Sequence, residues 1–127
     1  MSGTFTIGVK TLANVTAHLE QFGIKAENTI MLNRMKQIAN KKMVATEIDL
    51  NFAKHELREA ELMKSGKTYE QAHESVLKEQ GMYHIGYENK LYTEDAIKAG
   101  NAQMEKEAKN NNLNGIFNCT FINKKNK

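Results

Sequence analysis

The chain has 127 residues, of which 40% are hydrophobic and 26% are charged, and this composition is typical of one soluble globular domain. No apolar run approaches the roughly 18 residues that a membrane-spanning helix needs, and the N-terminus lacks the features of a signal peptide. The net charge of +3 permits an anionic partner without requiring one. The single cysteine, Cys119, excludes an internal disulfide framework and a cysteine-based zinc knuckle. We therefore expect a single domain over residues 1–127.

The N-terminal third predicts a strand and two helices. Residues 3–10 alternate between apolar and polar side chains, a pattern typical of a short strand. Apolar residues at helical spacing predict helices over about 12–22 and 26–39. His18 lies beside the apolar side of the first helix, and we interpret it as a partly exposed surface histidine. The lysines at 41–42 are expected in a solvated loop, with a phosphate-facing patch as the alternative.

The central stretch predicts two helices joined by a short turn. Thr46 is suited to cap the first helix, and Gly66 is suited to end it. Thr68 and Gln71 form a capping-box pattern at the start of the second helix. Helices joined by so short a turn usually pack antiparallel. The expected unit is a helical hairpin over about residues 46–80.

The first helix of this hairpin has a narrow polar face. At about 100° per residue, the solvated residues fall on one stripe roughly 80° wide. The residues of that stripe are Glu47, Asn51, Lys54, Arg58 and Glu61. The wider, covered arc also carries ionisable groups, namely Asp49, His55, Glu56 and Glu59. Burying such groups costs several kcal/mol unless they are paired, protonated or exposed in a cleft, so this arc indicates a functional site.

The C-terminal part predicts a loop, a helix and a β-rich segment. Residues 81–92 are expected to form an ordered loop with a helical turn near its end, and Thr93 is suited to cap a last helix to about residue 109. Residues 116–122 favour β structure and are expected to pair with the N-terminal strand. The predicted fold class is α+β, a predominantly helical single domain with the central hairpin and short β segments at both termini.

The preferred chemistry is metal-free acid–base cleavage of RNA. His55 and Glu59 are neighbours on one helix face, and His73 lies on the inward stripe of the next helix. A histidine paired with a carboxylate, together with a second histidine, can move protons near neutral pH. We assign His55 as general base or acid, Glu59 or Glu56 as its orienting partner, and His73 as the second acid–base group. This scheme uses no metal and no other cofactor. The substrate-binding candidates are Arg58, Tyr69, Tyr83, His84 and Tyr87.

Two other interpretations stay open. His55, Glu59 and His73 form a chemically sensible set of zinc ligands, which would make a metal-dependent nuclease. Position 59 holds glutamate where the zincin motif has its second histidine, and this disfavours a peptidase of that type. Alternatively, the buried charges tie the helices together, and the domain is a non-catalytic binding module.

The residues of the hairpin resemble a pattern in the C-terminal toxin domains of bacterial polymorphic toxins. These domains form the tips of CdiA-like contact-dependent inhibition proteins, filamentous-haemagglutinin-like proteins and Rhs proteins. The pattern comprises His55-Glu56, Glu59, Met63-x-x-Gly66 and Tyr69-x-x-Ala72-His73. The resemblance covers about residues 46–87.

The resemblance implies a specific biological setting. The domain would be part of a larger secreted protein and would act in the cytoplasm of a target bacterium. Its implied activity is nuclease action, tRNA cleavage in particular, and a cognate immunity protein would block it. The net charge of +3 departs from strongly basic nuclease toxins and allows a helper protein from the host cell or a different target.

Overall fold

The computed structural model describes residues 5–114, and all the regular secondary structure in this part of the chain is helical. Its helices are α1 (Val9–Glu20), α2 (Ala26–Ala39), α3 (Glu47–Lys64), α4 (Tyr69–Glu79), α5 (Glu88–Leu91) and α6 (Glu94–Asn114). No strand occurs within residues 5–114, so the predicted α+β class is wrong.

The expected N-terminal strand is replaced by an irregular lead-in to α1. Residues 5–8 have no regular structure, and the helix begins at Val9. The alternation of Phe5 and Ile7 has another cause, because both side chains pack on the helical core. A strand needs a partner for its backbone groups, and residues 5–114 offer none. The β segment expected over residues 116–122 lies outside the described residues.

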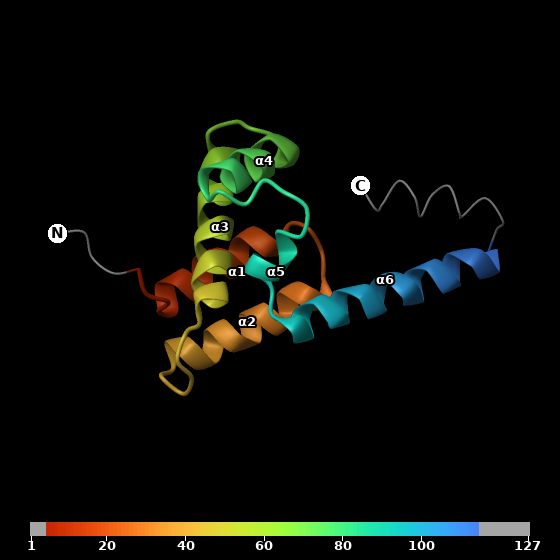
Figure 1. Ribbon diagram of the computed structural model, residues 1–127, viewed down its shortest axis with the longest axis horizontal. Helices are drawn as coiled ribbons and strands as arrows, with labels where there is room; N and C mark the ends of the chain where they lie inside the picture. The colour runs from red at the N-terminus through yellow and green to blue at the C-terminus, as the bar shows by residue number, and fades with distance from the viewer. Residues whose placement is uncertain (1–4, 115–127) are drawn as a thin grey trace.

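The helices are arranged around α3. Figure 1 shows α2 and α6 running side by side, with α3 rising away from them and α4 folding back beside its far end. The later turns of α6 continue away from the other described helices. None of the helices within residues 5–114 is both long enough and apolar enough to cross a membrane.

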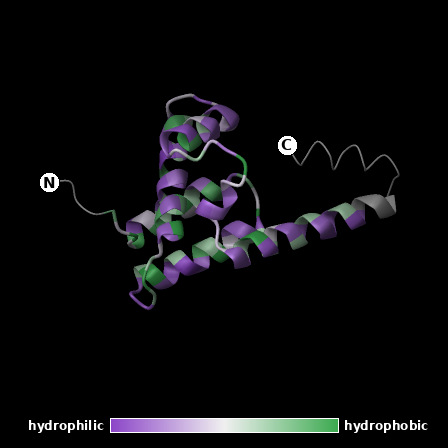
Figure 2. Cartoon of the chain, in the orientation of Figure 1, coloured by the Kyte–Doolittle hydropathy of each residue, from purple (hydrophilic) through white to green (hydrophobic). Residues whose placement is uncertain are grey.

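The main hydrophobic core lies where α1, α2 and α3 meet, and Figure 2 shows hydrophobic positions at this junction. Its fully buried side chains are Val15, Met31, Met35, Phe52, Ala53 and Ala96. A smaller cluster of Leu77, Met82 and Leu91 supports α4 and α5. The core therefore fixes α1 against α3, and the smaller cluster helps to hold α4 beside the far end of α3.

The predicted helical hairpin is confirmed, together with its capping. The Asp49 backbone N–H donates to Thr46 Oγ1 at 3.3 Å, and the Thr46 N–H donates to the Asp49 carboxylate at 2.9 Å. The Gln71 N–H donates to Thr68 Oγ1 at 3.2 Å in the same way. Gly66 has a φ of 114°, a conformation that side chains beyond glycine rarely adopt, and it ends α3. These local signals place α3 and α4 where the sequence predicts them.

Asp49 stabilises the start of α3. Its side chain is fully buried, and Arg34 on α2 binds it through two hydrogen bonds of 2.8 Å. Burial alone would raise the pKa of Asp49, but the hydrogen bonds from Arg34 and Thr46 outweigh it, so the pKa lies below its usual range. The carboxylate therefore stabilises the fold at pH values above the unfolded pKa of about 3.9, and this contribution is lost as the pH falls through the folded pKa.

We expect Asp49→Asn to lower the free energy of unfolding at pH 7 by about 2 kcal/mol, because it weakens both the cap and the charge-assisted pair. The difference from wild type should shrink as the pH falls below about 4, because the wild-type carboxyl is then also neutralised. Urea unfolding at pH 7 and pH 3 measures both values. Glu105→Gln, an exposed change on α6, is the control and should cost less than about 0.5 kcal/mol. Equal effects of the two variants would contradict this role.

Candidate metal centre

The covered arc of α3 carries the ionisable groups as predicted. Besides Asp49, the side chains of His55, Glu56 and Glu59 are buried, at 1%, 5% and 2% exposure. The arrangement of α1, α3 and α4 brings His18 and His73 to these residues. We refer to His18, His55, Glu56, Glu59 and His73 as the histidine–glutamate cluster.

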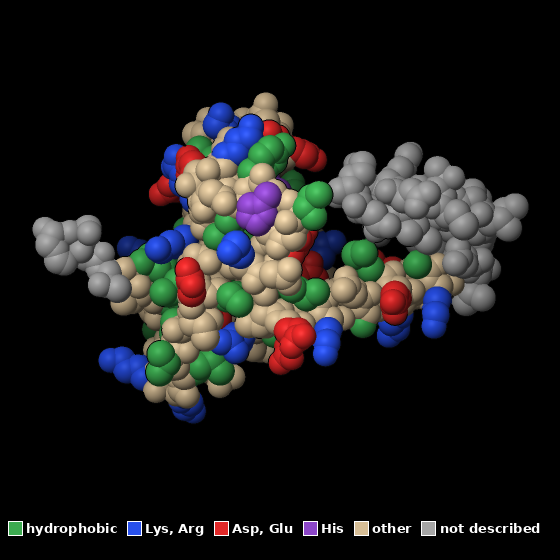
Figure 3. Space-filling view, in the orientation of Figure 1, with side chains coloured by type: hydrophobic (Ala, Val, Ile, Leu, Met, Phe, Trp, Pro, Cys, Tyr) green, Lys and Arg blue, Asp and Glu red, His purple; other side chains and the backbone are tan. Residues whose placement is uncertain are grey.

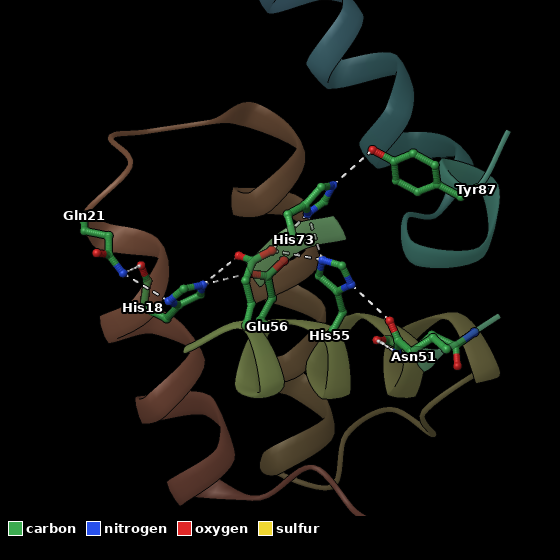
Figure 4. A network of polar contacts seen from close by, with 9 residues as sticks. His18, Gln21, Asn51, His55, Glu56, His73 and Tyr87 are labelled. Carbon is green, nitrogen blue, oxygen red and sulfur yellow. Dashed lines mark hydrogen bonds and ion pairs between the residues drawn. The ribbon is translucent and has the colours of Figure 1, made fainter. Parts of the chain in front are cut away.

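Three ligand-type atoms form a compact triangle at the centre of this cluster. His55 Nε2 lies 3.2 Å from Glu59 Oε2, His73 Nδ1 lies 2.9 Å from the same oxygen, and the two nitrogens are 3.1 Å apart. Figure 4 shows the rings of His55 and His73 turned toward one another across the α3–α4 seam. The sequence prediction that His73 approaches the covered arc of α3 agrees with this geometry.

His18 binds the other oxygen of Glu59. His18 Nε2 lies 2.8 Å from Glu59 Oε1. Gln21 Nε2 donates to the His18 carbonyl at 2.8 Å, so the same amide nitrogen also faces His18 Nδ1 at 3.0 Å as a donor. The ring proton therefore lies on Nε2 and points at Glu59. His18 thus holds Glu59 in place from α1.

The expectation of a partly exposed His18 is wrong, because the residue is only 5% exposed. Its position was readable from the sequence: Val15, His18, Leu19 and Phe22 follow the spacing of one buried helix face. The His18 ring also meets the Phe22 ring edge-to-face, with centroids 5.1 Å apart. What the sequence does not show is the partner, which lies on another helix.

The ring proton of His55 is held by Gln80. Gln80 Nε2 donates to the Asn51 carbonyl at 3.3 Å, which leaves its oxygen to accept from His55 Nδ1 at 3.0 Å. In neutral His55, the lone pair of Nε2 then faces Glu59 and His73. Gln80 therefore prepares His55 to act as a ligand through Nε2.

Two tyrosines fix the ring of His73. Its Nε2 lies 3.2 Å from the Tyr87 hydroxyl, and its ring stacks on Tyr69 with centroids 5.4 Å apart and planes inclined by 22°. The Tyr87 contact is drawn in Figure 4. His73 is consequently oriented from both sides, with Nδ1 directed at the triangle.

Glu59 is a carboxylate at the meeting point of three imidazoles. Burial alone would raise the pKa of Glu59, but the contacts of its carboxylate with His18, His55 and His73, led by the hydrogen bond from His18, outweigh it, and the net pKa lies far below its usual range. An ionised carboxylate is the form that metal ions bind.

The triangle has the dimensions of a metal-ligand set. Zinc with nitrogen and oxygen ligands at about 2.0–2.1 Å separates those ligands by roughly 3.3 Å in a tetrahedron and roughly 3.0 Å in an octahedron. Without a cation or an extra proton, the His55 lone pair and the Glu59 carboxylate face each other at 3.2 Å with no hydrogen between them. A divalent cation satisfies all three atoms at once.

Each ligand also has an outer partner, as metal-binding side chains in proteins usually do. Gln80 holds His55, Tyr87 holds His73, and His18 holds Glu59. Outer partners of this kind fix ring orientation and tautomer, so the three ligand atoms are positioned before any ion binds.

Glu56 is the one member of the cluster with an unused oxygen. It is 5% exposed, and its Oε1 makes no hydrogen bond, although it lies 3.5 Å from His18 Nε2. Burial, followed by the charge of Glu59, raises the pKa of Glu56 well above its usual range. Of the two carboxyl groups of the cluster, Glu56 is the one with an oxygen that no hydrogen bond satisfies.

A cleft of about 380 Å³ opens the cluster to solvent. Its walls are formed by Leu19, Phe22, Lys25, Glu27, Asn28, Glu56, Glu59, Tyr69, His73 and Tyr92. Two of the three ligand residues and Glu56 therefore face this cleft, whereas His55 does not line it. This cleft gives a small molecule or an extended chain a route to Glu59 and His73.

The structure does not bring the remaining site candidates into the cluster. Arg58 forms exposed ion pairs with Glu61 and Glu79. Tyr83 and His84 are exposed, and no hydrogen bond within the described residues joins either to the cluster. Among the five substrate-binding candidates, Tyr69 and Tyr87 contact His73, while these three lie elsewhere.

No protein-family model, curated protein or solved structure matches this chain.

Proposed function

We propose that the protein is a metal-dependent hydrolase whose divalent cation, best matched by zinc, is held by His55, Glu59 and His73. The observation that carries this proposal is the triangle of His55 Nε2, Glu59 Oε2 and His73 Nδ1, with sides of 2.9–3.2 Å. Two histidines and one glutamate are the donor set of one group of catalytic zinc sites, which leave a further position for water or substrate.

Glu56 supplies the general base in this scheme. It follows the first ligand directly in the sequence, lines the cleft and carries an oxygen without a hydrogen bond. Zinc in such a site lowers the pKa of bound water and polarises the bond to be cleaved. Glu56 takes the proton from the attacking water and passes it to the leaving group, which needs a carboxylate within hydrogen-bonding reach.

The burial of His55 supports a ligand role over a direct acid–base role. A general base has to come within about 2.6–3.2 Å of the proton that it abstracts. His55 is 1% exposed and both of its ring nitrogens already have partners, so a ribose hydroxyl has no path to it. RNA as the substrate, the delivery into another bacterium and the immunity protein remain predictions from the resemblance.

We expect the purified, chelator-treated protein to bind one equivalent of zinc and to gain stability when it does. Binding to the folded state at a free concentration of 100 times Kd stabilises by about 2.7 kcal/mol. Calorimetric titration and thermal unfolding with and without zinc measure the two effects. His73→Ala should weaken zinc binding more than about 100-fold. The matched control is His84→Ala, an exposed histidine outside the cluster, which should bind as wild type does. Identical zinc binding by wild type and His73→Ala would refute the proposed site.

A further inference from the structure

A second cleft adjoins the cleft beside the cluster. The second cleft, of about 250 Å³, lies against α2 and the first half of α6. Both clefts have Lys25, Glu27 and Tyr92 in their walls. We refer to the two adjoining clefts together as the groove. Its lining extends from Glu56, Glu59 and His73 to Ile97 and Met104 on α6. A groove with this extent suits an extended polymer better than a compact metabolite.

The charge of the groove is acidic. Among the residues that line the two clefts, Lys25 is the only lysine or arginine, whereas Glu27 and Glu88 stand beside it in addition to the carboxylates of the cluster. On the molecular face in Figure 3, acidic and basic side chains alternate without a continuous basic patch. Nucleic-acid binding depends on lysines and arginines that neutralise phosphates, and this groove offers the opposite charge.

The polar and apolar groups of the groove also indicate what it binds. The buried Oδ1 of Asn28 has no hydrogen-bond partner, and Asn28 lines the cleft beside the cluster. An unpaired acceptor costs about 1–3 kcal/mol unless a ligand donates to it, and a peptide offers one backbone N–H donor at each residue other than proline. Phe22, Tyr69 and Tyr92 add aromatic walls for apolar side chains.

We propose that the groove binds a polypeptide with lysine or arginine near the scissile bond, and that the cluster hydrolyses a peptide bond of that chain. The proposal rests on the metal centre proposed above. In the reaction, the oxygen of water bonds to the carbonyl carbon and the C–N bond breaks. One proton of the water passes through Glu56 to the leaving nitrogen, so the products are a carboxylic acid and an amine.

The test uses the zinc-loaded, full-length chain and two probes. One is a peptide library made by cleaving a bacterial proteome after glutamate, which leaves lysine and arginine inside the peptides, and the other is total tRNA. Mass spectrometry should find new termini in the library, with lysine or arginine enriched about 3-fold near the cut, while gel electrophoresis shows intact tRNA. Glu59→Ala protein, purified in parallel, reports any contaminating peptidase.

Two sets of variants test whether the acidic side chains of the groove select basic peptides. Glu27→Gln combined with Glu88→Gln should lower the ratio of cleavage rates between basic and non-basic peptides about 5-fold. Glu105→Gln, an exposed change on α6 outside both clefts, should leave that ratio unchanged. The substrate assignment alone is overturned if the zinc-loaded protein cuts tRNA or leaves every peptide intact. It is also overturned if the protein cleaves peptides with no preference for lysine or arginine near the cut. Failure to bind zinc overturns the metal centre instead.

Discussion

Replacing Glu59 with alanine is expected to abolish both zinc binding and hydrolysis. Glu59 Oε2 is one of the three ligand atoms, and Oε1 is the acceptor for His18. Loss of a ligand should reduce the zinc affinity more than the 10- to 100-fold that loss of an outer partner usually costs. The variant also leaves three imidazoles without their shared carboxylate, so we expect about 2 kcal/mol of destabilisation in the metal-free protein.

Calorimetric zinc titration and cleavage of the peptide library measure these effects. Glu59→Gln keeps the volume of the side chain but removes its charge, and it should show the same loss of zinc affinity with a smaller loss of stability. Glu61→Ala is the matched control, two residues further along α3 on the exposed face, and should bind zinc normally. Zinc binding by Glu59→Gln with wild-type affinity is incompatible with the proposed ligand set.

Glu56→Gln should separate catalysis from metal binding. Glu56 is not one of the three ligands, so we expect zinc stoichiometry and affinity to stay close to wild type. The amide cannot accept the proton of the attacking water, and kcat should fall by about 10²- to 10⁴-fold. Stability should be unchanged or higher, because the substitution removes a buried carboxyl group whose Oε1 has no hydrogen bond.

The measurement is kcat on the library peptide that wild type cleaves fastest, with zinc content determined on the same samples. Glu105→Gln makes the same chemical change on an exposed part of α6 and serves as the control. If Glu56→Gln lost zinc along with activity, Glu56 would be a ligand rather than the base. If it retained full activity, another group would have to take the proton.

The sequence predicted the elements whose signals are local. The caps at Thr46 and Thr68 and the glycine at position 66 act within one turn of chain, and the hairpin follows from them. The alternation of apolar and polar residues at the N-terminus was misleading because it is a local pattern, and a strand also needs a distant partner. A period of two in Phe5 and Ile7 shows that these side chains pack inward, but only a neighbouring strand makes such a segment a strand.

The candidate site was predicted in part. The covered arc of α3 marked His55, Glu56 and Glu59 because burying charge is costly, and the stripe on α4 added His73. The sequence could not show that Glu59 binds His18, because the two residues come from different helices that are far apart in the chain. The approach of His73 Nδ1 to His55 Nε2 depends on how α4 crosses α3, which the side chains at the contact decide.

Few buried apolar side chains hold α4 in place, and this affects how readily the helix opens locally. Among the described helices, α4 has its main contact with α3, and its buried apolar side chains are only Ala72, Val76 and Leu77. The bonds of His73 at the cluster therefore act together with the Arg58–Glu79 ion pair to hold this helix against α3. An ion bound between α3 and α4 would limit local opening of α4 far more than opening of α2, so metal supply would set how long the active hairpin stays assembled.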